Sequence, residues 1–256
     1  MISKNRIKDI HALGMKKNRD SRKQFVAEGP KVVGELLRTL PCIYIAATET
    51  WLAEHASEIT LKGTPVCDEV SESELCKASF LQTPQQVIAI FEKPAECPFD
   101  STLAALDICL ALDGVQDPGN VGTILRLADW FGISHIICSP DTADVYSPKV
   151  VQATMGALGR IQVHKAELPA LLSALPADIP IYGTFLNGKP LYQESLSPNG
   201  IIIMGNEGQG IRPATESLIR RRLFIPSWPE GRPTSESLNV AIATAIICAE
   251  FRRRQA

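Results

Sequence analysis

The stretch DGVQDPGNVGTILRLADWF, residues 113–131, decides how the rest of the chain is organised. An apolar run (108–112) leads into a loop of Gly, Pro and Asn, and this loop opens directly into an amphipathic helix. Two later segments repeat the order of apolar strand and polar, glycine-bearing loop: IIIMGNEGQG (201–210) and FIPSWPEGRPTSESLNVA (224–241). We therefore expect the fold to bring these three loops together.

The order of strands and helices predicts an α/β protein of two domains. After residue 101, short and nearly continuous apolar strands alternate with helices, which is typical of a parallel sheet covered on both faces. Residues 1–93 predict a smaller α/β domain, and residues 94–101, with two prolines, predict a linker to a larger domain at 102–256. Ligands of such sheets bind at the carboxyl ends of the strands, where all three loops lie.

Composition and charge narrow the class of protein. Apolar residues make up 45% of the 256 residues and charged residues 21%, as in ordinary globular proteins, and no apolar run is long enough for a membrane span. The net charge of −2 hides a basic segment at residues 4–23, which holds eight Lys or Arg against two Asp. This segment is either a solvated helix face or an arm that contacts the phosphates of a nucleic acid.

Cysteine and histidine usage argues against disulfides and metal sites. The seven cysteines include no CxxC pair and lie mostly in apolar runs, so we expect core residues in a reducing cytoplasm. The four histidines lack metal-ligand spacing, and we expect neither a metal nor a membrane partner. We expect His135, at a strand start outside every motif, to be structural.

The three loops fit none of the common nucleotide or nucleophile motifs. The glycines of the first loop do not form GxGxxG, and the chain holds no GxxxxGK[ST] and no GxSxG. What remains is a set of loops with many free backbone donors, which could bind a compact, polar and largely neutral ligand.

Three ordered motifs resemble those of the SpoU/TrmH family. They are DPGNVGTILR (117–126), MGNEGQG (204–210), and Ile225-Pro226 with SLNV (237–240). This resemblance implies an S-adenosylmethionine-dependent RNA ribose 2′-O-methyltransferase of the SPOUT class. It also implies a parallel-sheet domain with a C-terminal trefoil knot, and a homodimer built through that domain with active sites at the interface.

The N-terminal part resembles, more weakly, an L30e-like substrate-binding domain. The matching points are Arg22, FVAEG (25–29) and FLQTPQQVIA (80–89). This implies an RNA partner, with ribosomal RNA the first choice and transfer RNA the second. The competing hypotheses are a noncatalytic RNA-binding protein with a decayed methyltransferase domain and an enzyme that methylates a small molecule.

The resemblance assigns roles to eight residues. It makes Arg126 the group that activates the ribose 2′-hydroxyl. The residues that orient this arginine, the ribose and the cofactor are Asn120, Glu207, Ser237 and Asn239. The backbone groups that bind the adenosyl portion of S-adenosylmethionine are those of Gly205, Ile225 and Leu238.

Each assignment has a structural alternative. Asn120, Ser237 and Asn239 open helices and could simply cap them. Glu207 could be a solvated turn residue. Arg126 could pair with Asp129, but it interrupts an apolar run, and burial of an unpaired guanidinium would cost several kcal/mol. We therefore expect a functional arginine.

Overall fold

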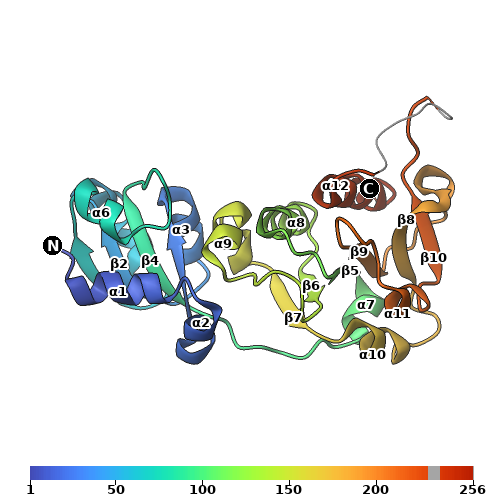
Figure 1. The fold of residues 1–256 in the computed structure, drawn as a ribbon, viewed down its shortest axis with the longest axis horizontal. Helices are drawn as coiled ribbons and strands as arrows, with labels where there is room; N and C mark the ends of the chain where they lie inside the picture. Colours follow the sequence, from blue (N-terminus) through green and yellow to red (C-terminus); the bar gives the residue numbers. More distant parts are fainter. Residues whose placement is uncertain (230–236, 256) are drawn as a thin grey trace. The chain divides into compact units, whose positions relative to one another are not determined.

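The computed structural model describes residues 1–229 and 237–255 (Figure 1). The chain forms two compact units. Unit 1 consists of Met1–Ala95 and Asp144–Arg160, and unit 2 consists of Glu96–Ala143 and Ile161–Ala256. The segment 144–160 therefore groups with the N-terminal residues, although the sequence motifs around it belong to the larger predicted domain. The predicted domain boundaries stay a prediction.

Unit 1 is built on a four-stranded mixed sheet in the order β1-β4-β2-β3. Strand β4 is antiparallel to both of its neighbours, and β2 is parallel to β3. Its elements are α1 (Lys4–Ala12), α2 (Lys16–Arg22), β1 (Gln24–Glu28), α3 (Pro30–Leu37), β2 (Cys42–Ala47), α4 (Glu49–Glu54), α5 (Ala56–Ile59), β3 (Val66–Glu69), α6 (Glu72–Ala78), β4 (Val87–Glu92), α9 (Pro148–Thr154) and the 3-10 turn η1 (Ala157–Gly159).

Local sequence signals explain several of these boundaries. Helix α6 begins with a capping box, in which the Ser71 hydroxyl accepts from the Glu74 N–H and the Glu74 carboxylate accepts from the Ser71 N–H. Proline occupies the first turn of α3, where no backbone donor is needed. Residues 13–15, around Gly14, separate α1 from α2.

Unit 2 is a parallel six-stranded sheet in the order β10-β8-β9-β5-β6-β7, which confirms the predicted fold class. Helices α8 and α12 cover one face, and α7, α10 and α11 cover the other (Figure 1). Its elements are α7 (Thr102–Leu106), β5 (Ile108–Asp113), α8 (Pro118–Trp130), β6 (His135–Cys138), β7 (Gln162–Lys165), α10 (Leu168–Ser173), β8 (Ile181–Pro190), η2 (Leu191–Gln193), β9 (Gly200–Gly205), α11 (Pro213–Glu216), β10 (Arg221–Phe224) and α12 (Val240–Arg253).

The strand register brings the first two motif loops to one edge of this sheet. Strands β5 and β9 are neighbours, and their last residues, Asp113 and Gly205, are paired. All six residues of each strand are buried, as the uninterrupted apolar runs predict. The loops that follow β5 and β9 therefore start side by side.

Two elements of unit 2 were not predicted from the sequence. Strand β7 has the sequence QVHK, and only His164 of its four residues is buried, so it lacks the apolar run of a central strand. Helix α7 has only five residues. No helix in the described ranges is long and apolar enough to cross a bilayer. The predicted trefoil knot stays a prediction.

Buried ionic contacts hold the segment 144–160 inside unit 1. The Arg19 guanidinium lies 2.6 Å from the Asp144 carboxylate, with the two side chains only 3% and 9% exposed. It also donates to the carbonyls of Leu13 and Gly14, each at 2.8 Å. Because Asp144 would stay buried without Arg19, this pair is expensive to break.

Replacing Arg19 should destabilise unit 1 selectively. We expect Arg19→Ala to lower the free energy of unfolding of this unit by about 3–5 kcal/mol, as for other buried pairs that lose one partner. The exposed pair Arg22–Asp9 provides the control, and Arg22→Ala should cost about 0–1 kcal/mol. Urea unfolding followed by fluorescence measures this, because Trp51 in unit 1 is fully buried. Equal effects of the two substitutions would contradict the prediction.

Candidate active site

A chain of side-chain hydrogen bonds joins the three motif loops. The Asn120 carboxamide donates through Nδ2 to Glu207 Oε1 at 3.0 Å. Its oxygen Oδ1 accepts from Asn239 Nδ2 at 2.9 Å. Asn120 thus bonds to the second loop and the third loop at once. The structure brings together three of the five side chains that the resemblance assigned.

The helix starts around this chain explain why Asn120 is free to bridge. The N-cap of α8 is Asp117, whose carboxylate accepts from the Asn120 backbone N–H at 2.8 Å. The alternative that Asn120 itself caps the helix is therefore wrong. Asn239 does both: its Oδ1 caps α12 by accepting from Ala241 and Ile242, while its Nδ2 holds Asn120.

The second loop is closed on itself by backbone contacts. Asn206 and Gly210 exchange two backbone hydrogen bonds of 2.9 Å, and the Asn206 side chain donates to the Gly114 carbonyl at 2.7 Å. A Cβ at Gly205 would lie 2.4 Å from the carbonyl carbon of Gly210, so only glycine fits there. This closure restrains the loop that carries Glu207. It also means that the close packing alone requires glycine at position 205, apart from the assigned cofactor role of Gly205.

An ionic cluster that the sequence analysis missed lies beneath this loop. The carboxylate of Asp113 is fully buried and accepts from the backbone N–H of Arg212 at 2.9 Å and from its Nε at 2.7 Å. Arg212 also pairs with Asp141 at 3.3 Å. Its hydrogen bond to Asp113 raises the pKa of Arg212, and the Ser139 hydroxyl lowers the pKa of Asp141.

A sequence signal for half of this cluster does exist. Asp113 ends an apolar strand, where a buried carboxylate needs a partner. The identity of that partner could not be predicted, because Arg212 lies 99 residues further along the chain. The contact joins Arg212, two residues after Gly210, to Asp113 at the end of β5. It thereby anchors the loop that carries Glu207.

Arg126 lies apart from these contacts. It is exposed on α8, and it makes no hydrogen bond or ion pair within residues 1–229 and 237–255, so the alternative of a pair with Asp129 finds no support there. The premise that this arginine would be buried in an apolar run is wrong, because Val121, Ile124 and Leu125 turn inward while position 126 faces outward. An exposed guanidinium that makes no contact with the described residues can be reached by a substrate.

The remaining assigned residues, Ser237, Leu238 and Ile225, lie at loop positions. Ser237 and Leu238 are exposed, and Ile225 directly follows β10. In the described part of the chain, the backbone groups of Ile225 and Leu238 make no hydrogen bond to other backbone groups. Their assignment to the adenosyl portion of the cofactor stays a prediction.

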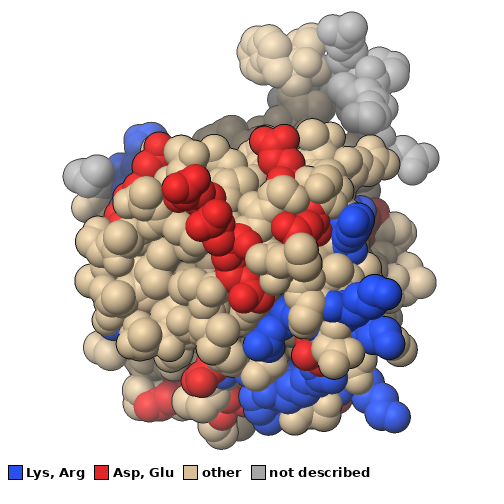
Figure 2. All heavy atoms as spheres, turned by 90° about the vertical axis from the view of Figure 1, so that its left-hand side faces the viewer, with Lys and Arg blue, Asp and Glu red and all other residues tan. Residues whose placement is uncertain are grey.

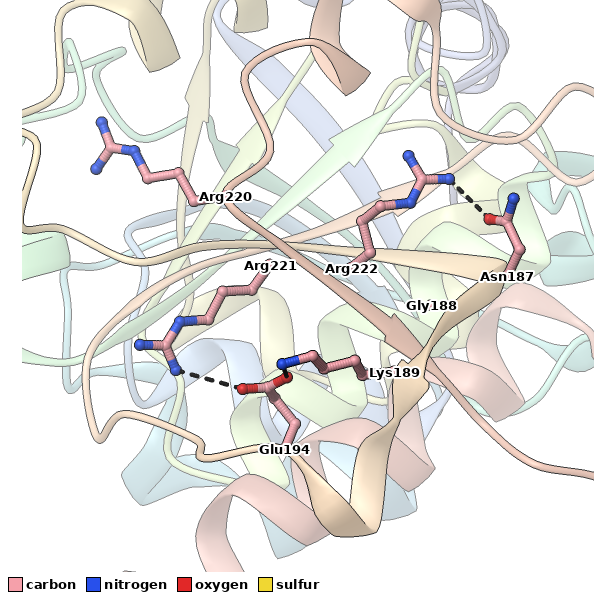
Figure 3. A pocket seen from close by; sticks show the side chains of 7 residues that line it. All are labelled: Asn187, Gly188, Lys189, Glu194, Arg220, Arg221 and Arg222. Atoms are coloured by element: carbon pink, nitrogen blue, oxygen red, sulfur yellow. Dashed lines mark hydrogen bonds and ion pairs between the residues drawn. The ribbon is translucent and has the colours of Figure 1, made fainter.

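The basic cluster Arg220–Arg222 borders a separate cavity of about 670 Å³ (Figure 3). The lining consists of Asn187, Gly188, Lys189, Glu194, Arg220, Arg221 and Arg222. Arg222 points toward Asn187, while Arg221 and Lys189 point toward Glu194. Arg220 donates to the backbone carbonyls of Pro176 and Ala177. Protein groups thus contact these cations, and none of the assigned residues lines the cavity.

No metal-binding constellation accompanies the site. Across residues 1–229 and 237–255, no three His, Cys, Asp or Glu side chains lie close enough together to hold an ion. His135, which we expected to be structural, shares a hydrogen bond of 3.1 Å with the buried His164.

Comparison with known protein families matches both parts of the chain. The model of the SpoU rRNA Methylase family matches residues 107–249, and that of the MRM3-like substrate binding domain matches residues 4–89. The first match contains all eight assigned residues.

Individual relatives extend over nearly the whole chain. The 23S rRNA (guanosine(2553)-2′-O)-methyltransferase RlmP of Bacillus subtilis is 32% identical, over 96% of both chains. A TrmH-family structure from Porphyromonas gingivalis is 42% identical with a TM-score of 0.88, over 99% of both chains. An AdoMet-bound rRNA methyltransferase structure from Sinorhizobium meliloti is 30% identical with a TM-score of 0.83, over 100% of this chain and 98% of that one. The protein belongs to the SpoU rRNA methylase family.

Proposed function

We propose that this protein transfers a methyl group from S-adenosylmethionine to a ribose 2′-hydroxyl of ribosomal RNA. The observation that carries the proposal is the Glu207–Asn120–Asn239 chain, which joins the three family motifs through the side chains assigned to them. The similarity to the B. subtilis 23S rRNA methyltransferase over 96% of both chains supports ribosomal RNA over transfer RNA. The AdoMet-bound relative supports the cofactor. The seven cysteines, which include no CxxC pair and lie mostly in apolar runs, support a reducing, cytoplasmic location.

The chain's own residues have to align a ribose hydroxyl and stabilise its oxygen as the proton leaves. S-adenosylmethionine, when bound, supplies an electrophilic methyl group. Arg126 presents an exposed guanidinium on α8 that is unpaired among the described residues, and it can hold a phosphate and the developing alkoxide of the ribose. Glu207 is held by Asn120 and can orient the sugar, while Ser237 offers an exposed hydroxyl beside Asn239. The backbone groups of Gly205, Ile225 and Leu238 would hold the adenosyl portion.

The function can be tested directly with labelled cofactor. Purified protein, methyl-labelled S-adenosylmethionine and protein-free 23S rRNA should give label on a ribose 2′-oxygen, located by nuclease digestion and mass spectrometry. Transfer RNA serves as the competing substrate. If the protein binds rRNA but neither binds the cofactor nor transfers label, the noncatalytic RNA-binding alternative replaces the enzyme.

Substitution of Arg126 tests its assigned role. We expect Arg126→Ala to lower the turnover number by about 100-fold or more, because a charge aimed at the developing oxyanion is lost. Cofactor affinity by calorimetry should be unchanged, since the exposed side chain supports no other contact within the described residues. Arg126→Lys keeps the charge but loses the planar fork, and should recover only part of the activity. Near-normal turnover of Arg126→Ala would contradict the role.

We also propose that unit 2 forms a homodimer through α8 and α12. One face of α12 is buried, with Thr244, Ile247 and Phe251, and it packs beside α8. Large apolar side chains remain on the outside: Ile242 of α12 is 54% exposed, and Trp130 of α8 is 83% exposed. A second copy of the chain would bury this surplus, and it would also cover the helix that carries Arg126.

A charge on the outer face of α12 should therefore separate the subunits. We expect Ile242→Glu to convert a dimer into a monomer at micromolar concentration in sedimentation velocity, with loss of methyl transfer. The control is Leu106→Glu, which places the same charge at an 80% exposed leucine on α7. A native protein that sediments as a fully active monomer, or a dimer that tolerates Ile242→Glu, would rule out this assembly.

A further inference from the structure

An exposed aromatic ring lies beside the basic N-terminal helices of unit 1. Phe80, just after α6, is 38% exposed, and its ring centroid lies 5.7 Å from that of His11. A Cβ added to Gly14 would lie only 2.9 Å from the Phe80 Cε1 atom, so the ring rests against the Gly14 backbone. We call Phe80, His11 and Gly14 together the Phe80 platform.

A buried carboxylate holds the Phe80 platform in place. Glu28, at the end of β1, is 5% exposed and accepts from the Phe80 backbone N–H at 2.9 Å through Oε1. Its Oε2 accepts from the Ser79 hydroxyl, which in turn accepts from the Leu81 N–H at 2.9 Å. Burial raises the pKa of Glu28, while the hydrogen bonds from Ser79 and Phe80 favour its charged form. The loop is therefore fixed before any ligand arrives, which lowers the entropy lost on binding.

Positive charge surrounds the platform. Lys4 and Lys8 lie one helical turn apart on α1, and both are exposed. Lys16 and Lys17 begin α2, two residues after Gly14, and are exposed as well. On the face that carries α1 and α6, Lys and Arg gather at the lower right, whereas Asp and Glu form a separate band above (Figure 2).

We propose that the Phe80 platform stacks an unpaired base of the RNA substrate while the neighbouring lysines hold its flanking phosphates. The inference rests on the RNA substrate of the proposed function. Aromatic faces bind bases of any sequence, and ammonium groups neutralise the backbone on either side. An unpaired base is required because the faces of paired bases are covered by their neighbours in a helix. The platform thus selects a loop, a bulge or a single-stranded end.

Removal of the ring should weaken binding of single-stranded RNA selectively. Fluorescence anisotropy with a short, labelled RNA of mixed sequence compares the full-length protein with its variants. We expect Phe80→Ala to raise the Kd by about 10-fold, the size of one lost base stack. Phe80→Trp should retain the wild-type Kd. Binding of the same RNA annealed into a duplex should stay within about twofold in both variants, because phosphate contacts carry it.

The matched control is Leu61→Ala, which shortens another exposed apolar side chain of unit 1 and should leave both Kd values unchanged. Unchanged single-strand affinity of Phe80→Ala, or equal losses for single strand and duplex, would overturn the platform. Fluorescence of the buried Trp51 verifies that each variant is folded. The assay needs no methyl transfer, so a protein that shows the Phe80 effect without activity would refute only the proposed function.

Discussion

The carboxamide of Asn120 is the group on which the site depends. A carboxamide both donates and accepts, and Asn120 uses its donor for Glu207 and its acceptor for Asn239. Alanine could make neither contact, and aspartate would place a negative charge against Glu207. Because Asp117 takes over the capping of α8, the Asn120 side chain is free for this task. One residue thus couples loops that are far apart in sequence.

The sheet supplies the frame that makes this coupling geometrically possible. Because Asp113 is paired with Gly205, the first two loops begin at the same position along the two strands. The buried contact between Asp113 and Arg212 anchors the end of the second loop to β5. The third loop leads into α12, and its residue Asn239 is the N-cap of that helix. In each case the residue that ends a strand or starts a helix also positions the next group, which explains why the motifs cluster at element boundaries.

Sequence patterns predicted the parallel sheet and the meeting of the three loops, because apolar runs and the rule on strand ends depend on local sequence. They did not predict the Asp113–Arg212 pair, whose partners meet only in the folded sheet. They misjudged the surroundings of Arg126, because the side on which a helix residue lies depends on the helix's rotation against its neighbours. Strand β7 was missed because its polar sequence carries no signal of a core strand. The grouping of 144–160 with unit 1 was not predicted because it involves long-range contacts, such as that between Arg19 and Asp144, 125 residues apart.

The central claim is that Glu207, Asn120 and Asn239 act as one unit in methyl transfer, and a double-mutant cycle measures this most directly. Single-turnover rates would be compared for Asn120→Ala, Asn239→Ala and the double variant, at saturating cofactor. If the residues act through each other, the double variant loses no more than about what the more severe single variant loses, with a coupling energy of about 0.5–3 kcal/mol. Losses that multiply would mean that the two residues act independently, and would contradict the account.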